Sequence, residues 1–325
     1  MAVTKAFAEE LEAGGIDRSP AARSSVRPSR WAPRPVPESE ADLAAHRFAL
    51  ASSGFTVLPS LLDAAHLDEL RDAAARALAE TQRQVEMGEP IPEDAIEHEI
   101  HPVARGIYLW GDAVLRLVEN EAVRRLCDAI IGPHKLIDVS LFVCLPSPEM
   151  TDVQVEGWHR DIAYDPDERR RYLWFILPLD DFGLDNGSTL LVAGSHRIPD
   201  PESERPDPGL HRFPSRVKML LKAGDALALD PMTYHSRGRN ITEHPRRMLN
   251  IMICHEDVPV HWQWDHAGQR IRDNASERIR TLLGGQLSAE ERAAFARANP
   301  PATRLARNVM AHSGAWPALP PDWQP

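Results

Sequence analysis

The hydrophobic pattern of the chain changes its period near residue 136, which predicts a mostly helical first part and a β-rich second part. In the first part, apolar residues at helical spacing predict helices over about 41–51, 64–84 and 112–131. Ser60 or Asp63 is suited to cap the long central helix, and Gly132-Pro133 is a stop signal for the third. The run 54–58 has the composition of a strand.

From residue 136 onward, short apolar runs separated by turn signals predict strands. The predicted turns include Asn186-Gly187, and Gly224-Asp225 divides one long run into two strands. The regular spacing is typical of a sandwich or a barrel. We therefore expect a mainly β fold with flanking helices. The runs cover about 137–145, 158–164, 171–179, 188–196, 216–230, 232–240 and 246–254, and a helix over about 270–298 follows them.

The same patterns suggest one domain preceded by a flexible arm. Residues 1–40 are rich in Ala, Arg, Ser and Pro, which predicts a poorly ordered arm. The domain, 41–325, divides into a mostly helical part (41–135), a β core (136–258) and a helical extension (259–325). Residues 86–104 predict a loop, and the Pro-rich excursion 197–216 is long enough to act as a lid.

Composition narrows the class of protein. The 325 residues carry a formal net charge of -11, which disfavours generic binding to nucleic acid or to an anionic membrane surface. The chain has no apolar run long enough to span a membrane and no secretory signal at its start. Three widely spaced cysteines indicate a reducing compartment, so we expect a cytoplasmic protein without a disulfide framework.

The candidate chemistry centres on His159 and Asp161. Residues two apart on a strand share a face, so this pair presents an imidazole and a carboxylate to one point. His235 ends a later predicted strand and is the candidate for a third ligand, which would complete a 2-His-1-carboxylate facial triad. Arg246 follows His235 by eleven residues across a turn-rich segment. Its forked guanidinium suits a buried carboxylate better than a lysine would.

The spacing of these residues resembles the phytanoyl-CoA dioxygenase (PhyH) family of Fe(II)/2-oxoglutarate oxygenases, over roughly residues 45–258. The run from Gly54 to Leu58 and the helix after it also look like the family's N-terminal element. The matching motifs are Trp158-His159-Arg160-Asp161, Leu179-Asp180-Asp181, Asn186-Gly187-Ser188, Gly194-Ser195-His196, Ala223-Gly224-Asp225, His235, Gly238, Asn240 and Arg246.

The resemblance implies a double-stranded β-helix core (jelly-roll, cupin-like). It implies iron ligands at His159, Asp161 and His235, and a 2-oxoglutarate anchor at Arg246. The reaction it implies is oxidation of a small molecule, most simply hydroxylation of an unactivated C–H bond, while 2-oxoglutarate and O2 become succinate and CO2. Desaturation, epoxidation or cyclisation with the same cofactors remain open. Because relatives that halogenate have a small residue at the position of Asp161, halogenation is not expected.

Several residues near these motifs have alternative interpretations. Arg247 should face away from Arg246, because neighbouring strand residues alternate. Trp158 and Tyr164 flank the predicted ligands and are candidate substrate contacts, although packing explains them equally well. Relatives carry an aromatic residue where this chain has Ile176, so a co-substrate role for the nearby Trp174 is not indicated.

Other polar residues receive structural interpretations. His255-Glu256-Asp257 repeats the His-x-Asp pattern but has no suitably spaced histidine and arginine after it. His196 is expected to hold a turn, and Arg160 to point away from the metal. Arg237 and Arg239 could meet an anionic substrate, although solvated loop charges are the simpler interpretation.

Two other classes of function stay open. One is a non-catalytic sensor module that binds metal or 2-oxoglutarate, and the other is a metal-dependent hydrolase, which would leave Arg246 unexplained. Succinate formation distinguishes the oxygenase from both. The substrate is expected to be a biosynthetic intermediate. Neither its identity nor the oligomeric state can be read from the sequence.

Overall fold

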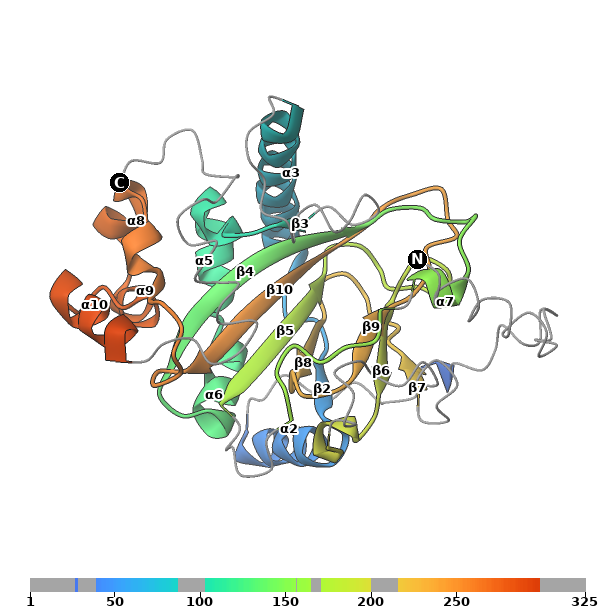
Figure 1. Ribbon diagram of the computed structural model, residues 1–325, viewed down its shortest axis with the longest axis horizontal. Helices are drawn as coiled ribbons and strands as arrows, with labels where there is room; N and C mark the ends of the chain where they lie inside the picture. Colours follow the sequence, from blue (N-terminus) through green and yellow to red (C-terminus); the bar gives the residue numbers. More distant parts are fainter. Residues whose placement is uncertain are drawn as a thin grey trace.

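Two β-sheets organise the computed structural model, which describes residues 27–28, 39–86, 103–155, 157–164, 171–199 and 216–298 (Figure 1). The larger sheet has the strand order β2-β8-β5-β10-β4-β3, and the smaller one β1-β7-β6-β9. All pairs are antiparallel except β1 with β7. The strands are β1 (Arg27–Pro28), β2 (Phe55–Leu58), β3 (Val103–Ala104), β4 (His134–Cys144), β5 (Tyr172–Pro178), β6 (Thr189–Val192), β7 (Arg216–Lys218), β8 (Ala226–Leu229), β9 (His235–Arg237) and β10 (Arg246–His255).

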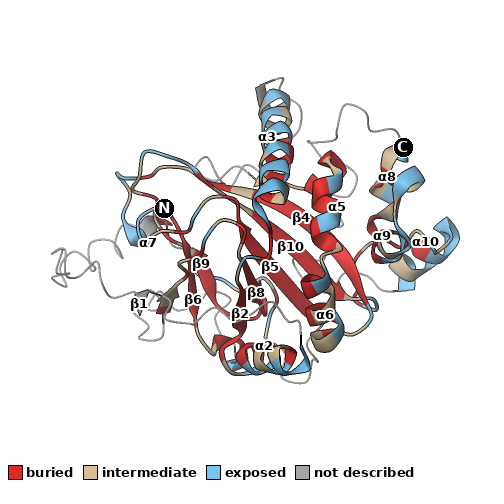
Figure 2. Ribbon diagram, turned by 180° about the vertical axis from the view of Figure 1, so that it is seen from behind, coloured by how far each residue is buried: buried red, intermediate tan, exposed pale blue. Residues whose placement is uncertain are grey.

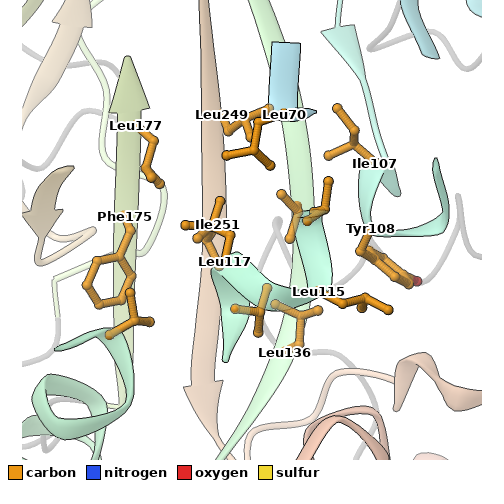
Figure 3. Packing of buried hydrophobic residues seen from close by; sticks show 14 of the residues in the cluster. Leu70, Ile107, Tyr108, Leu115, Leu117, Leu136, Phe175, Leu177, Leu249 and Ile251 are labelled. Carbon is orange, nitrogen blue, oxygen red and sulfur yellow. The ribbon is translucent and has the colours of Figure 1, made fainter. Parts of the chain in front are cut away.

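Helices cover one face of the larger sheet (Figure 2). Leu70 and Leu117 pack there with Leu249 and Ile251 of β10 in one large buried cluster (Figure 3). The α-helices are α2 (Glu40–Ser53), α3 (Ala64–Glu86), α5 (Asp112–Val118), α6 (Glu121–Ile130), α7 (Asp152–Val155), α8 (Gln269–Asn274), α9 (Glu277–Leu283) and α10 (Ala289–Ala298). Short 3-10 helices are η2 (Ile107–Trp110), η3 (Ser195–Arg197) and η5 (Gln263–His266).

The opposite face of the larger sheet packs against the smaller sheet. A second apolar cluster joins Trp174 of β5 and Leu229 of β8 to Leu191 of β6. Strand β10 shows the alternation that divides the two clusters, since Leu249 and Ile251 belong to the first and Met252 to the second. Residues of even number on β10, from Arg246 to Met252, therefore face the space between the sheets.

Most predicted elements are confirmed, and several differ. Residues 27–28 of the predicted arm and residues 103–104 of the predicted loop form the short strands β1 and β3. The helix predicted over 112–131 is two helices, because Asn120 leaves the helix and its side chain accepts a hydrogen bond from the backbone N–H of Ala122 at the start of α6. The helix predicted over 270–298 is three, with Ser276 capping α9 and Gly284 ending it in a left-handed conformation. The strand predicted over 158–164 is only a single bridge between His159 and His235. Asp63, rather than Ser60, caps α3 by accepting from the N–H of His66.

Some predictions fall outside the described residues. These are most of the arm 1–40, residues 87–102 of the predicted loop, residues 200–215 of the predicted lid, and the chain from 299 to 325. Within the described residues, none of the helices has both the length and the apolar character needed to cross a membrane.

Candidate metal centre

His159, Asp161 and His235 converge in the structure, as their spacing predicts. One ligand atom from each lies within 4.8 Å of the others, and among the described residues this is the one such group of three. His159 Nε2 is 3.4 Å from Asp161 Oδ1, and His235 Nε2 is 3.6 Å from Asp161 Oδ2. Two imidazoles and one carboxylate on one side of a point match a facial triad, which leaves other coordination positions open.

The backbone holds the three side chains together as a unit. His159 and His235 exchange two backbone hydrogen bonds of 3.0 Å, and the N–H of Asp161 donates to the carbonyl of Pro231 at 3.1 Å. The Nδ1 atoms of the two histidines lie 2.6 Å and 2.9 Å from the carbonyl oxygens of Gly157 and Thr233. An Nδ1–H bound to a carbonyl selects the tautomer with a free Nε2 lone pair, which is the arrangement that metal-binding histidines use.

The electrostatics of the centre favour unprotonated ligands. Burial by itself raises the pKa of Asp161, but the adjacent His235 and His159, together with Trp174, bring it well below its usual value. Burial, followed by the neighbouring His159, lowers the pKa of His235. The His159 side chain is 52% exposed and that of His235 only 11%, so the centre is reached by solvent from the His159 side.

Arg246 is a buried cation with no carboxylate partner among the described residues. It is 3% exposed, its Nη2 donates to the Gly187 carbonyl at 2.5 Å, and its guanidinium lies 4.4 Å from the centroid of the Phe182 ring. Its Nη1 is buried and has no hydrogen-bond partner within the described chain. Burial lowers the pKa of Arg246, against the opposing effect of Cys144. A buried guanidinium of this kind is a binding group for an anion.

Arg247 has a different role from Arg246. Its Nε and Nη2 donate to the two carboxylate oxygens of Asp180 at 2.9 Å and 2.8 Å. The expectation that the two neighbouring arginines face opposite sides of the strand is therefore confirmed. Arg247 is occupied by a structural ion pair, whereas Arg246 is available to a ligand.

The remaining candidates lie in other surroundings. Trp158 packs against Tyr234 and Val192, and the Tyr164 ring centroid is 5.7 Å from the Arg160 guanidinium, so their substrate contacts stay a prediction. Arg160 donates to the carbonyl oxygens of Ser195 and Ile198, in agreement with its predicted orientation away from the metal.

The two other histidine motifs have structural contacts. The second His-x-Asp pair is closed on itself, with His255 Nδ1 2.6 Å from Asp257 Oδ1 and Arg171 binding the same oxygen. His196 lies in the turn η3, as expected, with its Nε2 3.2 Å from the Ala51 carbonyl.

Sequence reasoning did not predict the role of Trp174. Its indole Nε1–H donates to Asp161 Oδ2 at 2.7 Å, and the side chain is fully buried. Alternation along β5 places Trp174 on the inner face, but the contact joins that strand to an irregular segment 13 residues earlier. No local pattern in the sequence reports such a contact.

The model of the phytanoyl-CoA dioxygenase (PhyH) family matches residues 50–248, more than half of the chain. The chain belongs to this family. The dioxygenase olcK of Penicillium canescens is 30% identical over 125 residues, which are 33% of this chain and 38% of that protein, well under two thirds of its length. The uncharacterized protein Rv1501 of Mycobacterium tuberculosis is 26% identical over 207 residues, 62% of this chain and 71% of that protein.

Solved structures share the fold of this family member. The 2-oxoglutarate-dependent epimerase SnoN of nogalamycin biosynthesis matches with a TM-score of 0.51 and 24% identity, covering 67% of this chain and 82% of SnoN. HygX of Streptomyces hygroscopicus, solved with nickel, 2-oxoglutarate and hygromycin B, matches with a TM-score of 0.51 and 15% identity, covering 66% and 88%. At these identities the likeness shows the fold alone.

Proposed function

We propose that this protein is an Fe(II)/2-oxoglutarate-dependent oxygenase that oxidises a small molecule, with hydroxylation as its basic reaction. The observation that carries the proposal is the convergence of His159, Asp161 and His235 on one side of a point, combined with a buried Arg246 whose Nη1 has no hydrogen-bond partner within the described chain. A metal ion and a dicarboxylate would satisfy both.

The donor set fits iron. Two neutral imidazole nitrogens and a carboxylate suit a divalent first-row metal, and the three-ligand face leaves room for co-substrate and oxygen. Bound iron would supply oxygen activation coupled to the decarboxylation of 2-oxoglutarate to succinate and CO2.

The surroundings of Arg246 fit the distal carboxylate of 2-oxoglutarate. Burial of a charged group without a counter-ion is costly, and the orphaned Nη1 would gain a charge-assisted bond from an arriving carboxylate. The carbonyl oxygens of Asn186 and Gly187 accept from Nε and Nη2 and fix the direction of the guanidinium. Arg246 would therefore set the length of the acceptable co-substrate.

In this mechanism the protein's own side chains hold and orient the metal ion and shield the centre from water. His159, Asp161 and His235 hold the metal, with the histidine tautomers set by the carbonyls of Gly157 and Thr233. The apolar cluster between the sheets keeps water away from the buried side of the centre. The substrate approaches from the exposed side, next to His159.

We further propose that the two facing sheets form a double-stranded β-helix and that residues 41–325 act as one catalytic domain. Three free, buried cysteines support a reducing, cytoplasmic location. Two proteins that share this fold, SnoN and SnoK, come from nogalamycin biosynthesis, which supports a biosynthetic intermediate as the substrate. They include an epimerase and a carbocyclase, so desaturation, epoxidation or cyclisation are alternatives that substrate placement would select.

The test is an anaerobic titration of metal-free protein with Fe(II) and 2-oxoglutarate, followed by the visible metal-to-ligand charge-transfer band. We expect the band in the wild type, its loss in His235→Ala, and weaker 2-oxoglutarate binding in Arg246→Met. Aerobic turnover should then yield succinate. Folded protein that binds Fe(II) but never develops the band would refute the co-substrate assignment and favour a sensor or a hydrolase.

A further inference from the structure

Trp174 donates a hydrogen bond to Asp161, one of the three proposed metal ligands, and lies behind it in the fold. Trp174 lies on β5 in the inner cluster and its indole N–H reaches Asp161 Oδ2 at 2.7 Å. The Tyr172 ring meets the indole edge-on at a centroid distance of 5.9 Å. A fully buried, packed indole has one fixed direction for its single donor.

Asp161 needs such an external constraint. It lies outside any regular strand, and its backbone is held through one N–H, by Pro231. Its two carboxylate oxygens face different histidines, with Oδ1 near His159 and Oδ2 near His235. Without a further contact, rotation of the carboxylate would let both oxygens bind a metal and occupy a position that a facial triad leaves open.

We propose that Trp174 is a positioning residue that engages Oδ2 and so makes Asp161 a one-oxygen ligand through Oδ1. The proposal rests on the oxygenase function above. An indole suits the task because it only donates, so it can neither bind the metal itself nor take a proton from the ligand. Partners of this type raise the affinity of metal sites by fixing their ligands.

The experiment compares Trp174→Phe with Phe175→Leu. Phe175 is the next residue on β5, equally buried, and belongs to the cluster on the helix-covered face, so it controls for the cavity that each change creates. Metal-free, full-length protein is titrated with Co(II), whose visible d–d spectrum reports coordination geometry. We expect about 10- to 100-fold weaker Co(II) binding and an altered spectrum in Trp174→Phe, and neither effect in Phe175→Leu.

A folded Trp174→Phe variant with wild-type affinity and spectrum overturns the inference. Folding is checked by urea denaturation, and if Trp174→Phe does not fold, Trp174→Met fills the space with a flexible side chain that has no donor. Failure of the wild type to bind Co(II) would instead refute the proposed function, so the two failures are distinguishable.

Discussion

The neighbouring arginines of β10 allow a prediction in which one substitution affects ligand binding and the next affects stability. Arg246 faces the space between the sheets with an orphaned Nη1, while Arg247 is bound to both oxygens of Asp180. We expect Arg246→Met to lose 2-oxoglutarate affinity and Arg247→Met to lose stability. The two variants are matched controls for each other, since they remove the same group from adjacent positions.

The expected magnitudes follow from the contacts. A carboxylate on Arg246 would gain charge-assisted hydrogen bonds whose loss costs about 3 kcal/mol, or about 100-fold in the dissociation constant. The Arg247–Asp180 pair is partly exposed, with 31% and 28% of the side chains accessible, so water screens it. Breaking it should cost only about 1 kcal/mol of unfolding free energy.

The pair also predicts a pH dependence. Burial raises the pKa of Asp180, but the hydrogen bonds from Arg247 outweigh burial, and the folded-state pKa is lowered. The stabilisation is therefore present above the unfolded pKa of about 3.9 and disappears as the pH falls through the folded-state value. The stability difference between wild type and Arg247→Met should shrink in acid.

Two assays test whether Arg246 binds 2-oxoglutarate and whether Arg247 contributes to stability. Urea denaturation at pH 7 and at about pH 3, below the unfolded pKa, measures the stability difference, and the anaerobic charge-transfer titration measures 2-oxoglutarate affinity. Weakened 2-oxoglutarate binding in Arg247→Met, or unchanged binding in a folded Arg246→Met, would show that the alternation of β10 does not assign the anchor.

Three further predictions concern local features. Burial lowers the pKa of Lys135 to about 8 from 10.5, so below pH 8 the buried ammonium costs stability. As the pH rises from 8 to 10.5, the unfolding free energy of wild type should therefore increase by up to about 3 kcal/mol relative to Lys135→Met. Urea denaturation across this pH range measures the difference. Asn120→Ala should lower the unfolding free energy by about 1 kcal/mol through loss of the α6 cap, and no change in the urea midpoint would contradict this. Gly187→Ala should weaken 2-oxoglutarate binding in the charge-transfer titration. The backbone at Gly187 has a φ of +80°, and the new Cβ would lie 2.3 Å from Cys144 Sγ. A Cys144→Ala background should restore part of the lost 2-oxoglutarate affinity.

Local periodicity was enough to predict most of the strands and to separate Arg246 from Arg247, because both depend on alternation within one segment. It was not enough where a polar residue interrupts an apolar pattern. Asn120 lies inside a run with helical spacing, and only its side-chain bond to Ala122 shows that one helix ends and another begins. The contact of Trp174 is still harder to predict from sequence, because its hydrogen bond to Asp161 depends on how two segments of the chain pack together.

The His159-x-Asp161 motif was interpreted correctly as a pair sharing one face, but the strand assumed in that argument is a single bridge. The two ligands converge because segment 157–161 is bound to the chain that carries the third ligand: His159 exchanges hydrogen bonds with His235, and Asp161 donates to Pro231. The three proposed ligands are therefore coupled through two short backbone segments. A change that shifts the turn at Pro231 should displace Asp161 and His235 together, so the geometry of the proposed centre depends on this turn as well as on the sheets that carry His235 and Trp174.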